Sequence, residues 1–133
     1  MTRINCIPPS ELTRQHLVAE YRELPRIFAL VREAIARGER PADRRNPLEY
    51  TLGTGHVRFF YPRLGYLLRR QRLLILEMQA RGYRPSFVEV DHLIEGIAEE
   101  WLADWEPTEL AMAVNRARIA ERLRAVPQPP EMI

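Results

Sequence analysis

The sequence predicts an all-α protein, a compact single domain of three main helices with long connecting loops. Apolar residues recur at helical spacing in three long stretches, and no stretch alternates strongly between apolar and polar residues as a strand would. A chain of 133 residues is long enough to bury a sizeable core and short enough for one domain. We therefore expect residues 1–133 to form a single domain, with the proline-rich residues 127–133 as a frayed tail.

The first helix is expected from about Glu11 to Arg37. Ser10 is a suitable N-cap before it, and Gly38 stands where a glycine often follows a helix. The apolar positions of this stretch are Leu12, Ala19, Ile27, Leu30, Val31 and Ala34. Their spacing predicts one buried helix face.

Pro25 interrupts this first helical stretch. Proline inside a helix removes a backbone hydrogen bond, here the one to the carbonyl of Tyr21. It should also push Leu24 away from helical geometry. The alternative is two successive helices, with Pro25 opening the second. In both cases Glu23 lies beside an irregular backbone.

Two further helices follow. One is expected from about Pro62 to Arg81, ended by Gly82, and the other from Pro107 to about Ala125. The predicted buried stripe of the former is Leu64, Leu67, Leu68, Leu74, Ile75 and Met78, with Gln71 as a polar step. That of the latter is Leu110, Ala113, Val114, Ala117 and Leu123. Short helical turns are expected around Val88–Trp105, where both tryptophans, Trp101 and Trp105, are predicted to belong to the core.

The composition restricts the compartment and the chemistry. No apolar run approaches the length of a membrane span, and polar residues interrupt the N-terminus too soon for a signal peptide. The single Cys6 excludes an internal disulfide and fits a reducing cytosol. One cysteine and three scattered histidines do not form a convincing zinc site. We expect a cytoplasmic protein without metal or other cofactor.

The net charge of +2 conceals an asymmetry along the chain. Residues 1–84 hold sixteen arginines and eight acids, a balance of +8, whereas residues 85–133 hold four arginines and ten acids, a balance of −6. Residues 85–110 contain eight acids and no base. The sequence thus predicts a basic side suited to a polyanion such as nucleic acid, and an acidic side. Arginines that decorate ordinary solvated helices are the alternative.

All twenty basic residues are arginines, so the only primary amine of the chain is its N-terminal one. Removal of Met1 would give this amine to Thr2. An α-amino group has a pKa of about 7.7–8.0, against about 10.4 for lysine, so part of it is neutral and nucleophilic near pH 7. Amines of this kind form imines with electrophilic carbon atoms.

A group of polar residues in the first helix could work with such an amine. His16 and Glu23 lie on nearly the same line of a helix. Arg22 and Arg26 are four residues apart, and Glu23 stands between them. Arginine binds phosphate, whereas a carboxylate among arginines suits proton transfer or a developing positive charge. An ordinary salt-bridged surface is the alternative.

Several blocks of the sequence resemble the pyrimidine-dimer DNA glycosylase/AP lyase family. The similarity covers about residues 1–82 well and residues 107–126 more loosely. The blocks are Thr2-Arg3-Ile4-Asn5, Ser10-Glu11-Leu12, Gln15-His16-Leu17, Ala19-Glu20-Tyr21-Arg22-Glu23-Leu24-Pro25-Arg26, Gly53-Thr54-Gly55-His56-Val57-Arg58-Phe59-Phe60-Tyr61, Arg70-Gln71 and Ala117-Arg118.

The resemblance implies a DNA repair enzyme for damaged double-stranded DNA, acting as a monomer in a prokaryotic or viral setting, near the nucleoid. In this family the threonine amine attacks C1′ at a pyrimidine dimer, an imine forms, and β-elimination cuts the strand. Thr2 and Glu23 match the catalytic nucleophile and carboxylate. The matching DNA-binding residues are Arg3, Gln15, His16, Arg22, Arg26, Gln71, Arg118 and Arg122.

The chain also departs from the family. Its tail, residues 127–133, contains no aromatic residue, unlike that of the best-known phage member, so the preference for dimers over abasic sites stays open. The alternatives are a glycosylase or lyase for another damaged base or for abasic sites only, and a non-catalytic arginine-rich module that binds nucleic acid. A weaker one is a protein-interaction domain that uses the acidic residues 85–110.

Overall fold

The computed structural model describes residues 3–125, and these confirm the all-α prediction. Their helices are α1 (Arg14–Glu23), α2 (Pro25–Ala36), α3 (His56–Phe59), α4 (Leu64–Ala80) and α5 (Glu109–Ala125), with short 3-10 turns at η1 (Pro9–Glu11), η2 (Asp91–Ile94) and η3 (Glu99–Trp101). No strand forms within this range. None of the described helices is long and apolar enough to cross a membrane.

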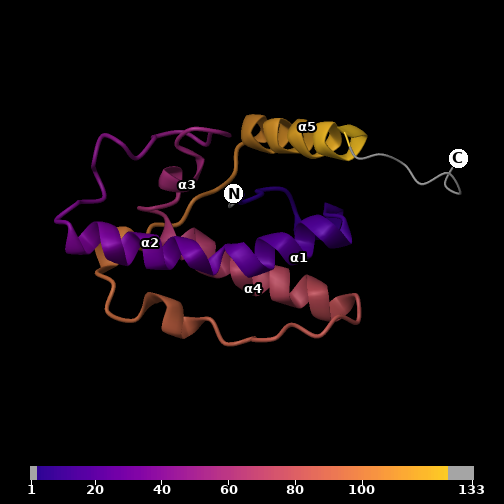
Figure 1. The fold of residues 1–133 in the computed structure, drawn as a ribbon, viewed down its shortest axis with the longest axis horizontal. Helices are drawn as coiled ribbons and strands as arrows, with labels where there is room; N and C mark the ends of the chain where they lie inside the picture. The colour runs from indigo at the N-terminus through magenta and orange to yellow at the C-terminus, as the bar shows by residue number, and fades with distance from the viewer. Residues whose placement is uncertain (1–2, 126–133) are drawn as a thin grey trace, which may run out of the picture.

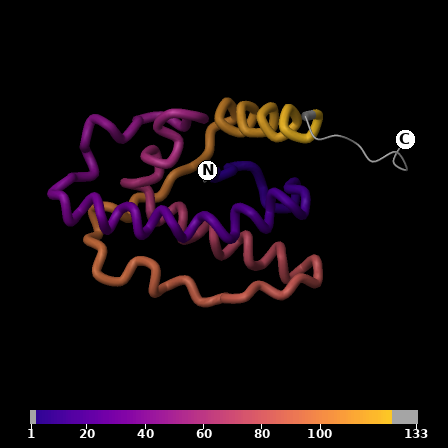
Figure 2. Tube along the Cα trace, viewed as in Figure 1, coloured from indigo at the N-terminus to yellow at the C-terminus, as the bar shows by residue number. Residues whose placement is uncertain are grey.

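The helices are arranged around the start of the chain (Figures 1 and 2). Helices α1 and α2 run end to end, and α4 packs against α1. The N-terminal segment, which we define as Arg3–Ile7, is drawn in indigo. Helices α1 and α5 lie on opposite sides of it. Residues 83–106 run back along the opposite side of the molecule from α5. The N-terminal segment is therefore enclosed between α1 and α5.

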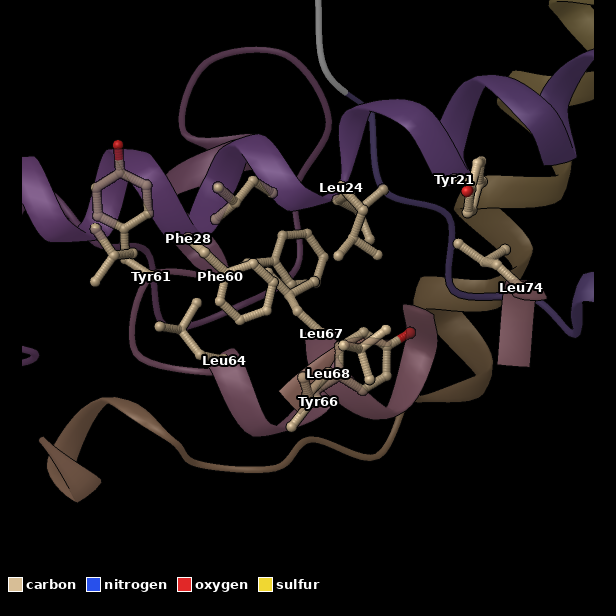
Figure 3. Close-up of a cluster of buried hydrophobic side chains, with 14 of the residues drawn as sticks. Tyr21, Leu24, Phe28, Phe60, Tyr61, Leu64, Tyr66, Leu67, Leu68 and Leu74 are labelled. Atoms are coloured by element: carbon tan, nitrogen blue, oxygen red, sulfur yellow. The ribbon is translucent and has the colours of Figure 1, made fainter. Parts of the chain in front are cut away.

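The core lies between α1, α2 and α4. Figure 3 shows Leu24, between α1 and α2, and Phe28 of α2 on the side of the core toward Leu64 and Leu67 of α4, and Tyr21 of α1 beside Leu74 of α4. All six predicted apolar positions of the α4 stripe are buried, as is Gln71 among them. Close packing continues at Gly65, where a side-chain carbon would lie only 2.4 Å from the carbonyl oxygen of Leu102. Position 65 requires glycine because any larger residue would collide with the backbone at Leu102.

The predicted interruption at Pro25 takes the form of two successive helices, with Pro25 as the first residue of α2. The expectation that Leu24 leaves helical geometry is wrong, because its φ of −53° and ψ of −42° are helical. Its amide still donates to the carbonyl of Glu20, at 2.9 Å. The carbonyl of Tyr21, which proline cannot serve, accepts a hydrogen bond from Nε2 of Gln71, at 3.0 Å. The buried amide of α4 thus replaces the missing backbone donor.

Two predictions about helix details are wrong. The N-cap of α1 is Thr13 rather than Ser10, and its hydroxyl accepts from the amide of His16. The predicted apolar stripe of α5 faces outward: Leu110 is 75% exposed, and the other four members are exposed as well. The buried positions of α5 are instead Ala111, Asn115 and Ile119. A polar residue therefore stands at the centre of the buried face.

Trp101 is buried, as predicted, and Trp105 is half-buried. The ring of Trp105 stacks on that of Tyr50, with centroids 5.6 Å apart and planes 15° apart. Short helical turns also occur where they were expected, at η2 and η3. Both tryptophans contribute to packing in this structure.

Candidate active site

The N-terminal segment is buried and held by side chains rather than by a neighbouring strand. The amide of Ile4 donates to Nε2 of His56 at 2.8 Å, and its carbonyl accepts from the hydroxyl of Tyr50 at 3.2 Å. The amides of Cys6 and Ile7 both donate to Oδ1 of Asn115, at 2.8 and 3.2 Å. Backbone groups buried in this way must be paired, and each of these side chains pairs at least one of them. The position of the segment is thereby fixed.

A buried polar network joins the segment to three helices. Glu20 of α1 accepts from Nε and Nη2 of Arg70 at 2.8 and 3.1 Å, and from Asn5 at 2.9 Å. Arg70 of α4 also donates to the carbonyl of Ile7 at 2.6 Å, and Asn115 of α5 donates to Asn5 at 2.8 Å. Burial opposes the charge of Arg70, but Glu20 raises the pKa of Arg70 overall. The negative charge of Glu20 is thus matched inside the protein.

A cleft of about 310 Å³ opens beside this segment, between α1 and α5. It is lined by Arg3, Asn5, His16, Ala19, Glu20, Glu23, Arg118, Ile119 and Arg122. Five of the predicted site residues therefore meet in one place, although they come from the N-terminal segment, α1 and α5. The predicted alignment of His16 and Glu23 on one face of α1 is observed.

The cleft carries excess positive charge. Burial and the nearby charges of Arg118 and Arg122 lower the pKa of Arg3. Among the described residues, the Nη1 atom of Arg3 has no hydrogen-bond partner although it is buried. Burial, Arg122 and Arg3 likewise lower the pKa of His16, which favours its neutral imidazole. Such a cleft favours an anionic ligand such as phosphate.

Glu23 is the acid of the cleft that is not neutralised by a close partner. Its side chain is 26% exposed, and the ion pair found for it within the described part of the chain, with Arg26, has an N–O distance of 4.0 Å. At this length the contact is not a hydrogen bond. A carboxylate left open in this way can accept a proton or face a positive charge that forms on a ligand.

Gln15 and Arg22 lie outside the cleft. They line a neighbouring hollow on α1 together with Arg14, Val18 and Ala19, and Ala19 also belongs to the cleft. The side chain of Arg26 is 66% exposed. The predicted bracketing of Glu23 by two arginines is therefore correct only for Arg26, and loosely so, because Arg22 makes no ion pair with Glu23.

The prediction that Gln71 contacts DNA is wrong in this structure, because its side chain is fully buried and donates to the carbonyl of Tyr21. Thr2 and residues 127–133 lie outside the described residues. Arg3, the neighbour of Thr2, lines the cleft. Within residues 3–125, no three His, Cys, Asp or Glu side chains come close enough together to hold a metal ion.

Sequence reasoning missed the residues that hold the segment in place, His56, Asn115, Tyr50 and Arg70. Two signals were available for them. His56 and Arg70 stand in blocks that carried the family resemblance, and Asn5 lies between apolar residues, so it needs a buried polar partner. Nothing in the local pattern of α5 indicates that Asn115 is that partner.

One comparison with known proteins bears on this arrangement. A family model described as "Pyrimidine dimer DNA glycosylase" matches residues 1–87 of the 133. The matched range contains the N-terminal segment, α1, α2, α3 and α4, with Arg3, His16 and Glu23 of the cleft. Arg118 and Arg122 lie beyond it, so their place in the site follows from the geometry of α5.

Proposed function

This chain belongs to the pyrimidine dimer DNA glycosylase family, and we propose that it is a bifunctional enzyme that both releases a damaged base and cuts the strand as an AP lyase. The observation that carries the proposal is the cleft beside the N-terminal segment, in which the open carboxylate of Glu23 lies with Arg3, Arg118 and Arg122. A carboxylate would weaken a surface that only binds phosphates. It is useful where a cationic sugar or a proton must be handled.

The proposed nucleophile is the α-amine of Thr2 after loss of Met1. Its nitrogen lone pair attacks C1′ of the 5′ nucleotide of the dimer, and the C1′–N bond breaks as the base leaves with the bonding electrons. The attached nitrogen then loses a proton to Glu23, the C1′–O4′ bond breaks, and O4′ takes up that proton, so the sugar ring opens and an imine forms. Loss of a proton from C2′ expels the 3′ phosphate, so the C3′–O bond breaks by β-elimination. Glu23 would accept these protons and stabilise the cationic sugar.

The arginines of the cleft supply the binding side of the proposal. Arg3, Arg118 and Arg122 would contact phosphates next to the lesion, and His16 would lie beside it as a neutral imidazole. Gln15 and Arg22 of α1, which line the neighbouring hollow, and Arg26 of α2 would contact the flanking DNA backbone. Affinity built from phosphate contacts falls as salt rises.

Trapping with borohydride tests the chemistry. The protein lacking Met1 is incubated with an abasic-site duplex and borohydride, and we expect a stable adduct that maps to Thr2. Because the chain contains no lysine, an amine-specific acetylating reagent can modify only the α-amine, and this treatment should abolish the adduct. DNA binding without an adduct would indicate the non-catalytic module instead.

Glu23→Gln tests the carboxylate, with Glu33→Gln as the matched control, since Glu33 is an exposed glutamate on α2. We expect Glu23→Gln to reduce strand cutting by about a hundredfold or more and to leave binding intact, whereas the control should cut normally. Normal cutting by Glu23→Gln would remove Glu23 from this role. Duplexes that carry a dimer, an oxidised base or an abasic site then identify the lesion.

A further inference from the structure

His56 is the only side chain described that accepts a hydrogen bond from the amide of Ile4. Ile4 is two residues after Thr2, and two residues of chain span at most about 7 Å. The anchored Ile4 amide is therefore only two residues along the chain from the proposed nucleophile. The carbonyl of Ile4 is held by Tyr50, so this peptide group is anchored on both sides.

The contacts of His56 determine its protonation state. Nδ1 lies 2.7 Å from the carbonyl oxygen of Thr51, which can only accept, so Nδ1 carries the hydrogen. Nε2 faces the amide of Ile4, which can only donate, so Nε2 carries a lone pair. Both bonds exist together only in the neutral ring with its hydrogen on Nδ1. A proton added to Nε2 would oppose the donor of Ile4.

The surroundings of His56 favour this neutral form. The ring is buried, and the edges of Tyr50 and Phe60 pack against it at interplanar angles of 80° and 85°. Burial is the largest cause that lowers the pKa of His56, and the positive charges of Arg3 and Arg118 lower it further, against the opposing effect of the Thr51 carbonyl.

We propose that His56 is a positioning residue: its neutral imidazole fixes the N-terminal segment so that the amine of Thr2 reaches the substrate, and its protonation releases the segment and slows the reaction. This inference rests on the proposed function. His56 touches no reacting atom in it. Its contribution is to hold the Ile4 amide, and the same bond makes catalysis sensitive to acid.

Two substitutions separate the two hydrogen bonds of His56. His56→Gln places an amide oxygen where Nε2 was, so it can still accept from Ile4, and it does not titrate. His56→Asn places an amide where Nδ1 was, so it can donate to Thr51 but cannot reach Ile4. We expect His56→Gln to form the borohydride adduct nearly as fast as the wild type at pH 7. His56→Asn should be about ten- to a hundredfold slower, because a misplacement of about 1 Å can cost that much. Its DNA affinity should stay within about twofold.

The pH profile supplies a readout that a merely structural role would not move. The ratio of the wild-type rate to the His56→Gln rate cancels every titration that the two proteins share. We expect this ratio to be constant above pH 6.5 and to fall by up to about tenfold per pH unit once His56 is protonated. A ratio that stays constant at every acidic pH at which both proteins remain folded would overturn the proposal, even if His56→Asn fails to fold.

Hydrogen exchange of the Ile4 amide, followed by NMR, separates this inference from the proposed function. Its protection should fall in His56→Asn, stay in His56→Gln, and fall in the wild type on acidification. Unchanged protection in His56→Asn would show that His56 does not hold the segment. The expected protection pattern without any adduct at any pH would instead disprove the proposed function, and with it the role of His56 in catalysis, although the anchor itself would stand.

Discussion

The arginines of the cleft and those that face the acidic segment (residues 85–110) differ in their partners. Arg69 and Arg40 pair with Asp104 and Glu100 at 2.9 and 3.1 Å, and Arg72 pairs with Asp91. In the cleft, by contrast, Arg118 is 3.8 Å from Glu121, and no acid among the described residues lies within 4 Å of Arg3 or Arg122.

This difference shows how the charge asymmetry of the sequence is used. The acidic segment folds back on the body of the molecule, where several of its carboxylates neutralise arginines. Arg32 also donates to two of its carbonyl groups, those of Leu93 and Glu95. The predicted division into a basic and an acidic side is therefore incomplete. What stays unmatched is the positive charge of the cleft, which is where a phosphate is proposed to bind.

The largest effect is expected from breaking the buried pair below the cleft. Arg70→Met leaves Glu20 buried without its cation, so the free energy of unfolding should fall by about 3–5 kcal/mol. Urea denaturation measures this change. The unpaired negative charge of Glu20, which lines the cleft, would also make the cleft less positive. The difference between the arginines of the cleft and those that face the acidic segment would then disappear.

A double variant serves as the control for the buried pair. Glu20→Gln combined with Arg70→Met removes both charges, so it should recover part of the lost stability. A decrease below about 1 kcal/mol in the single variant would mean that this ion pair does not hold the N-terminal segment in place.

A smaller effect is expected when one arginine is removed from each region. Arg122→Gln should weaken binding to an abasic duplex about fivefold and reduce the slope of log affinity against log salt by about one, because one phosphate contact is lost. The matched Arg72→Gln should change neither, because Arg72 is neutralised by Asp91. Fluorescence anisotropy across a salt series, with Glu23→Gln as the background to prevent cutting, measures both. Equal losses in the two variants would refute the contrast.

The helices and the cleft could be predicted to different degrees for a physical reason. Helix α4 follows local rules, so its spacing of Leu64, Leu67, Leu68 and Leu74 correctly predicted its buried face. Apolar spacing failed to predict the buried face of α5, because this face packs against the polar backbone of the N-terminal segment, which needs hydrogen bonds. Asn115 satisfies that backbone from 109 positions away from Cys6, and no local pattern contains such a contact.

The lining of the candidate cleft was predicted in part, because the proposed chemistry calls for particular residue types. Glu23 and His16 were found from their helical spacing, and Arg3, Arg118 and Arg122 from the resemblance, and all five line the cleft. Gln71 was assigned wrongly, because a polar residue in a recognised block can serve the fold. Its amide is needed for the carbonyl that Pro25 leaves open. Whether a polar side chain faces solvent or a buried backbone group depends on tertiary structure.

The smallest effect is expected from Asp91→Asn, which frees Arg72 without touching the cleft. This pair is exposed, with side chains 50% and 71% accessible, so its loss should change the free energy of unfolding by less than about 1 kcal/mol. DNA affinity should rise less than about twofold at physiological salt, where charges more than about 8 Å from the DNA are screened. A rise as large as the loss in Arg122→Gln would mean that net charge controls binding. An unchanged affinity would place the control in the arginines of the cleft, which we propose to hold a phosphate beside Glu23.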